Sequence, residues 1–362
     1  MNRTLLGLFI VLVVAGISAA VALLDPTALT RSIERRDPVD VSIFYGGEKS
    51  AFLANPKVQD IIEDRYRVNL TSTRAGSVEM ATTLPTEDRD CIWPSNAVAV
   101  ELARNAGKPV KGDDLIFNSP IVFFAWTEIA EALAKTDAVR EDETGRLVAD
   151  VAEIGSMIEA GTRWREDLGV NVYGAFRIIS TDPTRSNSGN IWSALLATAF
   201  NEGQVPTPED LPELLPRLDA YFDAAGHMEA SSGDIFENFL NQGIGARPII
   251  VGYENQLVEF LFANSDYSDL IRQRIRVIYP EPTIFASHPL ISLTPNCSRL
   301  TEALLDPDIQ ALAWSDHGFR TGLVGVENDM KLISAANMPE TISLVVPMPT
   351  AAVLEEVIDA IR

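Results

Sequence analysis

The chain has 362 residues, which exceeds one typical domain, so we expect two compact lobes. A formal net charge of −22 argues against binding to nucleic acid or to anionic lipid, because both need basic patches. The two cysteines, Cys91 and Cys297, and the three scattered histidines form no zinc motif, so we predict no metal site. The cysteines either form one disulfide or remain separate buried thiols.

The N-terminal stretch Leu5–Leu24 carries no charge and is followed by Asp25 and Pro26. About 20 apolar residues can cross a bilayer, whereas the apolar part of a cleaved signal is usually shorter. We therefore favour a retained membrane anchor over a signal peptide that is cleaved near Ser18–Ala20. Either interpretation makes residues 1–37 an anchor or signal with a linker, and it places the rest of the chain outside the cytoplasm.

The first strand is predicted at Val39–Tyr45, after which the sequence Gly46–Ser50 opens a helix. This junction resembles part of a phosphate loop but lacks the GxxxxGK[ST] spacing, so we predict no nucleotide site. The glycines suit a sharp turn with close backbone approach, which makes Gly47, Glu48 and Ser50 ligand candidates. The alternative is that Glu48 and Ser50 only cap the helix.

A second junction of this kind follows a short apolar strand at Asp90–Trp93 and leads into a helix at Ala97–Asn105. Ser95 and Asn96 lie between the two elements and are ligand candidates, with helix capping as the alternative role. Further along the chain, the charged run Lys135–Arg146 is predicted to be a solvated loop.

The stretch Ser180–Asn190 follows an apolar run, Val172–Ile179, which is predicted to be a strand, and precedes a helix at Ile191–Phe200. A strand that turns into a helix leaves N–H groups free at the helix start, beside the positive end of the helix dipole. Such a junction can hold an anion or a polar ligand, although an ordinary capped helix is the alternative. The candidates here have small hydroxyl or amide side chains: Thr184, Ser186, Asn187 and Ser188.

Another strand, at Arg247–Gly252, ends in a polar turn that opens a helix at Leu257–Ala263. This turn adds Glu254 and Asn255 to the ligand candidates, by the same argument. The remaining predicted elements are a strand at Ile275–Tyr279, a late strand at Ile342–Val346 and a final amphipathic helix at Ala351–Ile361.

Four stretches occur in an order that is typical of one known family. In chain order they are Gly46–Ser50, Trp93–Asn96, Thr181–Gly189 and His317–Arg320, the last of which ends in Gly-Phe-Arg. From about residue 38 to its C-terminus, the chain resembles the bacterial extracellular solute-binding proteins of the type II periplasmic-binding fold. The molybdate- and sulfate-type binders are the subgroup that it resembles most, although it lacks a lipid-anchoring cysteine.

The resemblance implies an α/β fold with two Rossmann-like lobes, a hinge and a ligand cleft between the lobes. Residues 38–121 and 284–362 are expected to form a discontinuous first lobe, and residues 122–283 an inserted second lobe. The crossings between the lobes are expected near Ser119–Phe124 and Pro282–Ser287.

The function that the resemblance implies is extracytoplasmic capture of a small polar solute for an ABC-type importer with a membrane permease. The alternative is a membrane-anchored ligand sensor or scaffold of the same fold, with a signalling partner. Neither hypothesis needs a cofactor, and the sequence has no GxSxG, HExxH, Walker A or GxGxxG motif that favours an enzyme. If Glu48, Glu254 and Glu281 lie near the cleft, they repel an oxyanion, which leaves cations, amines, peptides and neutral solutes open.

Overall fold

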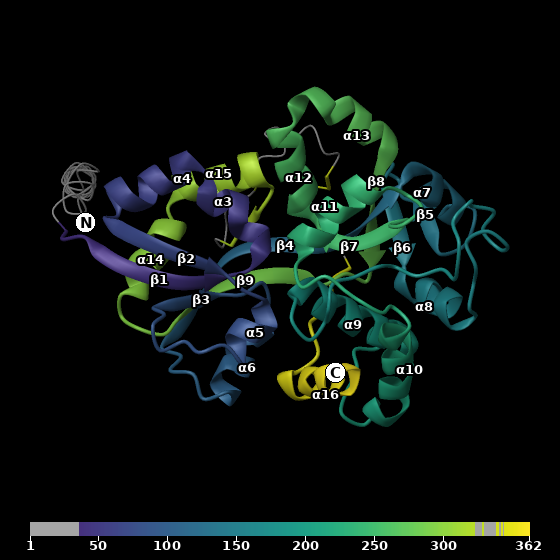
Figure 1. Ribbon diagram of the computed structural model, residues 1–362, viewed down its shortest axis with the longest axis horizontal. Helices are drawn as coiled ribbons and strands as arrows, with labels where there is room; N and C mark the ends of the chain where they lie inside the picture. The colour runs from purple at the N-terminus through teal and green to yellow at the C-terminus, as the bar shows by residue number, and fades with distance from the viewer. Residues whose placement is uncertain (1–35, 323–327, 329–337, 340–341, 343) are drawn as a thin grey trace, which may run out of the picture.

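The computed structural model describes residues 36–322, 328, 338–339, 342 and 344–362. Figure 1 shows them as two α/β lobes side by side, which share strands at the centre of the molecule. The predicted α/β fold with two lobes is therefore confirmed. The predicted anchor at Leu5–Leu24 lies outside the described residues, and among the residues that are described no helix is long and apolar enough to cross a bilayer.

The first lobe is built on strands in the order β2-β1-β3-β9-β4. β1 (Val39–Tyr45) has the predicted bounds and pairs in parallel with β2 (Val68–Arg74) and β3 (Cys91–Trp93). β9 (Phe285–Ser292) comes back from the second lobe and pairs antiparallel with β3 and with the first part of β4 (Gly112–Trp126).

Short helices follow the ends of the first-lobe strands. The helix predicted after Gly46–Ser50 consists of consecutive short segments, because Asn55 and Pro56 interrupt it. The Asn55 side chain accepts a hydrogen bond from the Lys57 N–H at 3.0 Å, and Pro56 fits only the first turn of the new segment. The helical segments here are η1 (Gly47–Lys49), α3 (Ser50–Ala54), α4 (Pro56–Asp60), η2 (Ile61–Arg65), α5 (Ser77–Ala81), α6 (Val98–Asn105), α14 (Cys297–Leu304) and α15 (Pro307–His317).

Strand β4 connects the two lobes, because its partners change partway along its length. Up to Pro120 it pairs with β9, and from Ile121 it pairs with β7 (Ile249–Tyr253) and β8 (Ile275–Glu281). We propose on this basis that the second lobe comprises residues 122–283 and that the chain on either side, apart from the C-terminal helix described below, forms the first lobe.

The predicted solvated loop at Lys135–Arg146 contains a strand, so that prediction was wrong. β5 (Val139–Glu141) pairs antiparallel with β6 (Leu147–Asp150), which in turn lies parallel to β8. The Asp142 carboxylate fixes the turn between them by accepting the Thr144 N–H at 2.8 Å. Charged side chains are common on edge strands, and this is why the charge pattern concealed β5.

The strand predicted at Val172–Ile179 does not form. Gly174 takes a φ of 97°, and only Ile179 reaches the sheet, where it makes hydrogen bonds of 3.1 and 2.8 Å with the backbone of β7. Phe176 and Ile178 are buried in the second-lobe core, so the apolar pattern arises from packing rather than from strand pairing.

Helices surround the second-lobe sheet. α9 begins at Asn187, earlier than the predicted Ile191, with Ser186 as its N-cap. The other helical segments are α7 (Thr127–Leu133), α8 (Val151–Glu159), α10 (Leu211–Asp223), α11 (Ser232–Gln242), α12 (Glu254–Ala263), η3 (Ser265–Tyr267) and α13 (Ser268–Arg274).

The C-terminal segment returns to the second lobe. Helix α16 (Ala351–Ile361) lies at the bottom of the view in Figure 1 and places Val353 and Leu354 in the second-lobe core. The late strand predicted at Ile342–Val346 lies partly outside the described residues, and Val345 forms an isolated bridge with Thr283.

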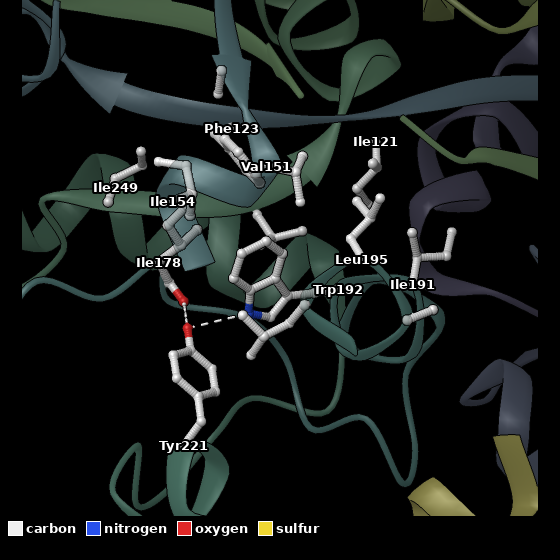
Figure 2. Packing of buried hydrophobic residues seen from close by; sticks show 14 of the residues in the cluster. Ile121, Phe123, Val151, Ile154, Ile178, Ile191, Trp192, Leu195, Tyr221 and Ile249 are labelled. Atoms are coloured by element: carbon white, nitrogen blue, oxygen red, sulfur yellow. Dashed lines mark hydrogen bonds between the residues drawn. The ribbon is translucent and has the colours of Figure 1, made fainter. Parts of the chain in front are cut away.

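The second-lobe core is organised around Trp192 of α9, which packs edge-to-face on Phe123 of β4. Figure 2 shows its indole N–H donating to the Tyr221 hydroxyl at 3.1 Å, and that hydroxyl donating to the Ile178 carbonyl at 2.6 Å. The buried polar groups of these aromatic side chains are thereby satisfied, which helps to hold α9, α10 and the irregular segment in fixed positions.

A disulfide between Cys91 and Cys297 resolves the alternatives left open by the sequence. It joins β3 to the start of α14, and both cysteines are fully buried in the first-lobe core. Because these elements belong to the two separate chain segments of that lobe, the bond ties the segments together.

Candidate ligand site between the lobes

A cavity of about 230 Å³ lies where the two lobes meet. The first lobe lines it with residues 46–48, 74–77 and 79, and the second lobe with residues 185–187, 230–232 and 234. The cavity therefore belongs to neither lobe alone, and a molecule held in it contacts both.

Helix starts converge on this cavity from both lobes. Asn187 opens α9, which has 14 residues, and Ser232 opens α11, which has 11 residues. From the first lobe, Gly47 and Ser77 lie where η1 and α5 follow β1 and β2. N–H groups of the first turn have no partner within their own helix. Those of Val78, Gly189 and Gly233 are bonded to other groups, and the remaining ones supply hydrogen-bond donors and a favourable potential for negative charge.

Two glycines allow the lobes to come this close. A Cβ at Gly76 would lie 2.4 Å from the carbonyl oxygen of Arg185, and one at Gly47 would lie 2.6 Å from the hydroxyl oxygen of Ser231. Both contacts cross from one lobe to the other. Glycine is therefore required at Gly76 for the closed arrangement, because a backbone atom opposes it there.

Two ion pairs cross the rim of the cavity. Arg74 of the first lobe pairs with Asp234 of the second at 2.7 Å, and Arg185 of the second lobe pairs with Glu79 of the first at 2.7 Å. The hydrogen bond to Glu79 raises the pKa of Arg185 above its ordinary value. Since these side chains are partly exposed, each pair contributes only about 0.2–1 kcal/mol to closure.

Glu48 is the one carboxylate that is both buried and part of the cavity lining. Its Oε1 accepts hydrogen bonds from the Lys49 ammonium and the Ser95 hydroxyl, and His288 Nδ1 lies 3.5 Å from the same oxygen. Burial alone would raise the pKa of Glu48, but the Lys49 charge and the His288 contact outweigh it and hold that pKa well below its ordinary value. Glu48 is therefore ionised at neutral pH.

Lys49 and His288 lie next to Glu48 without lining the cavity. Lys49 is fully buried and contacts the Ser95 hydroxyl at 3.0 Å; burial lowers its pKa, whereas Glu48 favours its charge. Burial, together with the nearby Lys49, lowers the pKa of His288 to about 4, so this imidazole is neutral at pH 7. Glu48 and Lys49 thus form a buried ion pair without net charge.

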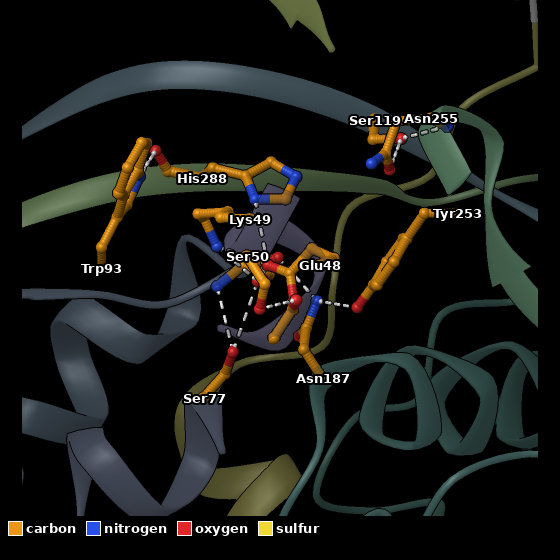
Figure 3. A network of polar contacts seen from close by, with 12 residues as sticks. Glu48, Lys49, Ser50, Ser77, Trp93, Ser119, Asn187, Tyr253, Asn255 and His288 are labelled. Carbon is orange, nitrogen blue, oxygen red and sulfur yellow. Dashed lines mark hydrogen bonds and ion pairs between the residues drawn. The ribbon is translucent and has the colours of Figure 1, made fainter. Parts of the chain in front are cut away.

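Asn187 links the lobes beside this pair. Its side-chain N–H groups donate to the Ser95 carbonyl at 2.6 Å and to the Tyr253 hydroxyl at 3.0 Å, the second of which is visible in Figure 3. Its Oδ1 is buried and has no hydrogen-bond donor among the described residues. Burial and the Glu48 charge raise the pKa of Tyr253 well above its ordinary value, so the hydroxyl keeps its proton.

Four residues singled out from the sequence line the cavity, and a fifth lies one layer behind it. Gly47, Glu48, Ser186 and Asn187 are in the lining, while Ser95 is fully buried behind Glu48. Their contact with a ligand stays a prediction, but the structure does bring them together from three distant stretches of the chain.

The other sequence candidates are engaged elsewhere. Ser50 donates to the Gly47 carbonyl at 2.6 Å, Asn96 accepts the Val98 N–H at 3.0 Å in the turn that leads into α6, and Thr184 donates to Asp182 at 2.7 Å. These are the capping and turn roles that the sequence left as alternatives.

Ser188 and Asn255 make side-chain contacts of their own. Ser188 lies 2.6 Å from the Thr181 hydroxyl, and the Ser119 hydroxyl donates to Asn255 at 3.1 Å, beyond Tyr253 in Figure 3. Neither Ser188 nor Asn255 is in the cavity lining.

Glu254 and Glu281, which were expected to add negative charge near the cleft, do not line this cavity. Glu254 is buried in a two-point ion pair with Arg320, at 2.8 and 3.0 Å, and also accepts from the Tyr279 hydroxyl at 2.8 Å. Glu281 pairs with Arg140 at 2.6 Å. Because both carboxylates are neutralised away from the cavity, they do not oppose an anionic ligand there.

Several lining residues were not among the sequence candidates: Arg74, Ser77, Glu79, Arg185, Ser231, Ser232 and Asp234. Ser77, Ser231 and Ser232 lie at helix starts, so the junction pattern used elsewhere contained a signal for them. The charged residues gave no such signal, because their role depends on which surface of one lobe faces the other.

Among the described residues, no group of three or more His, Cys, Asp or Glu side chains is placed to hold a metal ion. The polar atoms that the cavity offers are helix-start N–H groups, serine hydroxyls, the Asn187 amide, the Glu48 carboxylate, and at the rim the guanidinium groups of Arg74 and Arg185 with their carboxylate partners Asp234 and Glu79. This mixture suits hydrogen bonding to a small polar molecule.

The two lobes, their shared strands and the cavity between helix starts define the type II periplasmic-binding fold, as the comparisons with solved structures confirm. The ferric binding protein from Campylobacter jejuni matches with a TM-score of 0.56 and 12% identity over 89% of this chain and 97% of that one. The sulfate-binding protein SubI from Mycobacterium tuberculosis matches with a TM-score of 0.52 and 15% identity over 88% and 96%. Iron-bound HitA from Pseudomonas aeruginosa matches with a TM-score of 0.52 and 14% identity over 89% and 97%.

No protein-family model and no curated protein sequence matches the chain. The likeness to solved structures at these low identities shows the fold alone.

Proposed function

We propose that this protein is a solute-binding protein that captures a small polar solute between its lobes and presents the loaded form to a membrane importer. The observation that carries the proposal is the cavity of about 230 Å³, to which both lobes contribute helix starts and polar side chains. A ligand that contacts both lobes stabilises the closed arrangement relative to an open one, so a partner that recognises the closed form distinguishes the loaded protein from the empty one.

The disulfide and the N-terminal sequence support a location outside the cytoplasm. Disulfides persist in oxidising compartments, and Cys91–Cys297 is a buried structural bond. We propose that Leu5–Leu24 serves as a retained anchor, with cleavage as a signal as the alternative, and that a permease is the partner in the membrane.

Binding rather than catalysis is the activity we propose. The solved structures of this fold named above include a sulfate-binding protein and a ferric binding protein. The cavity holds serine hydroxyls, but the Glu48 carboxylate is hydrogen-bonded to Lys49 and Ser95 rather than to a serine of the lining, and His288 and Lys49 do not line the cavity. Iron is a less suitable ligand than an organic or oxyanionic solute, given the absence of a metal-holding cluster in the described part of the chain.

Titration calorimetry and small-angle scattering together test this proposal. A panel of oxyanions, amino acids, sugars and divalent metals is titrated into the protein, and scattering is recorded with and without each of them. We expect one class of probe to bind and to reduce the radius of gyration. Failure of every probe to bind, with no change in scattering, would count against the proposal.

The sensor hypothesis shares this binding step and differs in the partner. An anchored binder can report to a neighbouring membrane protein, and the chain lacks a lipid-anchoring cysteine after Leu24. Affinity purification from membranes distinguishes the two: a permease and its ATPase support import, whereas a signalling protein supports sensing.

A further inference from the structure

The Glu48 carboxylate is only half satisfied by the protein. Its side chain is 5% exposed, and its contacts with Lys49, Ser95 and His288 all end on Oε1. Among the described residues, no hydrogen-bond donor reaches Oε2, although Glu48 lines the cavity. Oε2 is not one of the fully buried polar atoms that lack a partner, so it is open to the cavity, and a donor that a ligand brings can reach it.

The rest of the cavity offers the opposite chemistry. The N–H groups of Gly189 in α9 and Gly233 in α11 are already bonded to hydroxyl oxygens, which leaves Asn187, Ser188 and Ser232 as first-turn donors. The hydroxyls of Ser186, Ser231 and Ser232 add further donors, and the guanidinium groups of Arg74 and Arg185 lie at the rim. These groups stabilise negative charge on a ligand. Glu79 and Asp234 also line the cavity, but their carboxylates are paired with Arg185 and Arg74, so Glu48 is the buried ionised acceptor that the cavity presents beside these donors.

The size of the cavity fits a molecule larger than a simple ion. Its volume is about 230 Å³, whereas a water molecule occupies roughly 30 Å³ in the liquid. There is room for an acidic group near the helix starts and for a donor group against Glu48 at the same time.

Building on the proposed function, we propose that the ligand is a small solute that combines an anionic group with an N–H or O–H donor, and that Glu48 Oε2 accepts this donor. Two chemistries meet this description: a protonated oxyanion such as hydrogen phosphate, and an amino acid, whose ammonium group is the donor. An anion without a donor places its own oxygen against the ionised Glu48, and is excluded by repulsion between two acceptors.

Matched pairs of probes test the requirement for a donor. At pH 7.5, calorimetry compares inorganic phosphate with sulfate, which have the same shape, and glycine with acetate, which differ by the ammonium group. We expect the donor-bearing member of one pair to bind at least about 100-fold more tightly, because sites built around a hydrogen bond discriminate strongly. The pair that shows the difference identifies the source of the donor.

Glu48→Gln tests whether this residue is responsible. The amide can donate as well as accept, so the preference within the responsive pair should fall at least about 10-fold, through weaker binding of the donor-bearing probe, stronger binding of its donor-free analogue, or both. Glu63→Gln, at an exposed position of η2 outside the cavity lining, should leave the preference unchanged.

The substitution leaves Lys49 buried without its counter-charge, so a double variant guards against loss of folding. Glu48→Gln with Lys49→Met removes both charges together, and thermal unfolding shows whether each variant is folded. Equal binding of sulfate and phosphate and of acetate and glycine by the unsubstituted protein, or an unchanged preference in both folded variants, overturns the inference while leaving a solute-binding function intact. Absence of binding by all four probes overturns the inference, and absence of binding by the whole panel described above overturns the proposed function as well.

Discussion

Glu48, which lines the cavity, and the buried Lys49 and His288 behind it influence one another's protonation. Lys49 and His288 are fully buried, and both approach the carboxylate of Glu48. Breaking a buried ion pair leaves an uncompensated charge and is strongly destabilising, by about 3–5 kcal/mol. A substitution at Glu48 or Lys49 therefore changes stability as well as ligand affinity, and the two effects need separate measurement.

His288 makes the folded state sensitive to acid. Its pKa is lowered to about 4, from an ordinary value of 6.5, so the unfolded chain binds its proton first as the pH falls. Stability from this residue is present above pH 6.5 and is lost as the pH falls toward 4, with a loss of up to about 3 kcal/mol.

Urea unfolding at pH 7.5, 5.5 and 4.5 checks this dependence. We expect His288→Gln to flatten the decline in the free energy of unfolding, whereas His227→Gln, at an exposed position, should keep the slope of the unsubstituted protein. An identical slope in the His288 variant would show that other groups cause the decline.

At the scale of single residues, the sequence identified those cavity residues that neighbouring residues mark as part of a turn or a helix start. Glu48 follows a glycine pair and Asn187 opens a helix, and both signals are readable from neighbouring residues. Arg74 and Arg185 could not be found in this way, because each matters through a partner on the other lobe.

At the scale of elements, the junctions between strands and helices set how closely the lobes approach. Gly76 precedes α5 and faces the Arg185 carbonyl before α9, with no space for a Cβ between them. The backbone φ of Gly76 is −68°, so alanine is acceptable to the local chain and only the contact between lobes forbids it.

We expect Gly76→Ala to weaken ligand binding roughly 10-fold or more, equivalent to about 1.4 kcal/mol, by holding the lobes apart. Scattering should show a larger radius of gyration in the presence of ligand than for the unsubstituted protein. Gly112→Ala is the matched control, since no atom lies within 4 Å of a Cβ there. Unchanged affinity in the Gly76 variant would mean that the cavity does not need this contact.

Element predictions succeeded where local chemistry determines structure and failed where tertiary packing does. β1 matches its predicted bounds because a strand pattern meets an unmistakable glycine turn. The run Val172–Ile179 failed because its apolar residues fill a core without pairing, and β5 was missed because edge strands tolerate charge.

At the scale of the whole molecule, the rim ion pairs bias the balance between open and closed forms. Arg185 and Glu79 attract each other across the cleft, and a partly exposed pair of this kind is weakened by salt. Arg185→Glu should therefore open the cleft and weaken binding several-fold at low salt.

A charge swap separates this effect from direct ligand contact. If the ion pair acts as a latch, meaning that it stabilises the closed form by attraction across the cleft, the double variant Arg185→Glu with Glu79→Arg restores closure as measured by scattering. Restored closure without restored affinity would mean that the Arg185 guanidinium also contacts the ligand, and no restoration of either would contradict the latch.

The disulfide should stabilise the first lobe in particular. Replacing Cys91 and Cys297 together by alanine removes a cross-link that spans 206 residues, and we expect a loss of about 2–5 kcal/mol. Differential scanning calorimetry should show a lower unfolding temperature. The near-UV circular dichroism signal, to which the buried Trp93 contributes, should decrease at a lower temperature than in the unsubstituted protein. An unchanged unfolding temperature would show that packing alone holds the two segments of this lobe.

The order of the junctions along the chain was enough to predict two lobes, because each junction is a local signal and their succession is typical of this fold. The way in which the lobes face each other was not predictable, since it depends on contacts such as Asn187 with Ser95 that join distant stretches.

The same cross-link has a consequence for how the protein is made. Cys91 emerges during synthesis 206 residues before Cys297, and nearly all of the second lobe is encoded between them. Cys91 cannot form this bond until the second lobe and Cys297 have been synthesised, and oxidation then closes a covalent ring that includes the inserted lobe. Covalent closure of the first lobe thus follows synthesis of the second, so oxidation of the two thiols is a late step in the formation of the complete two-lobe fold.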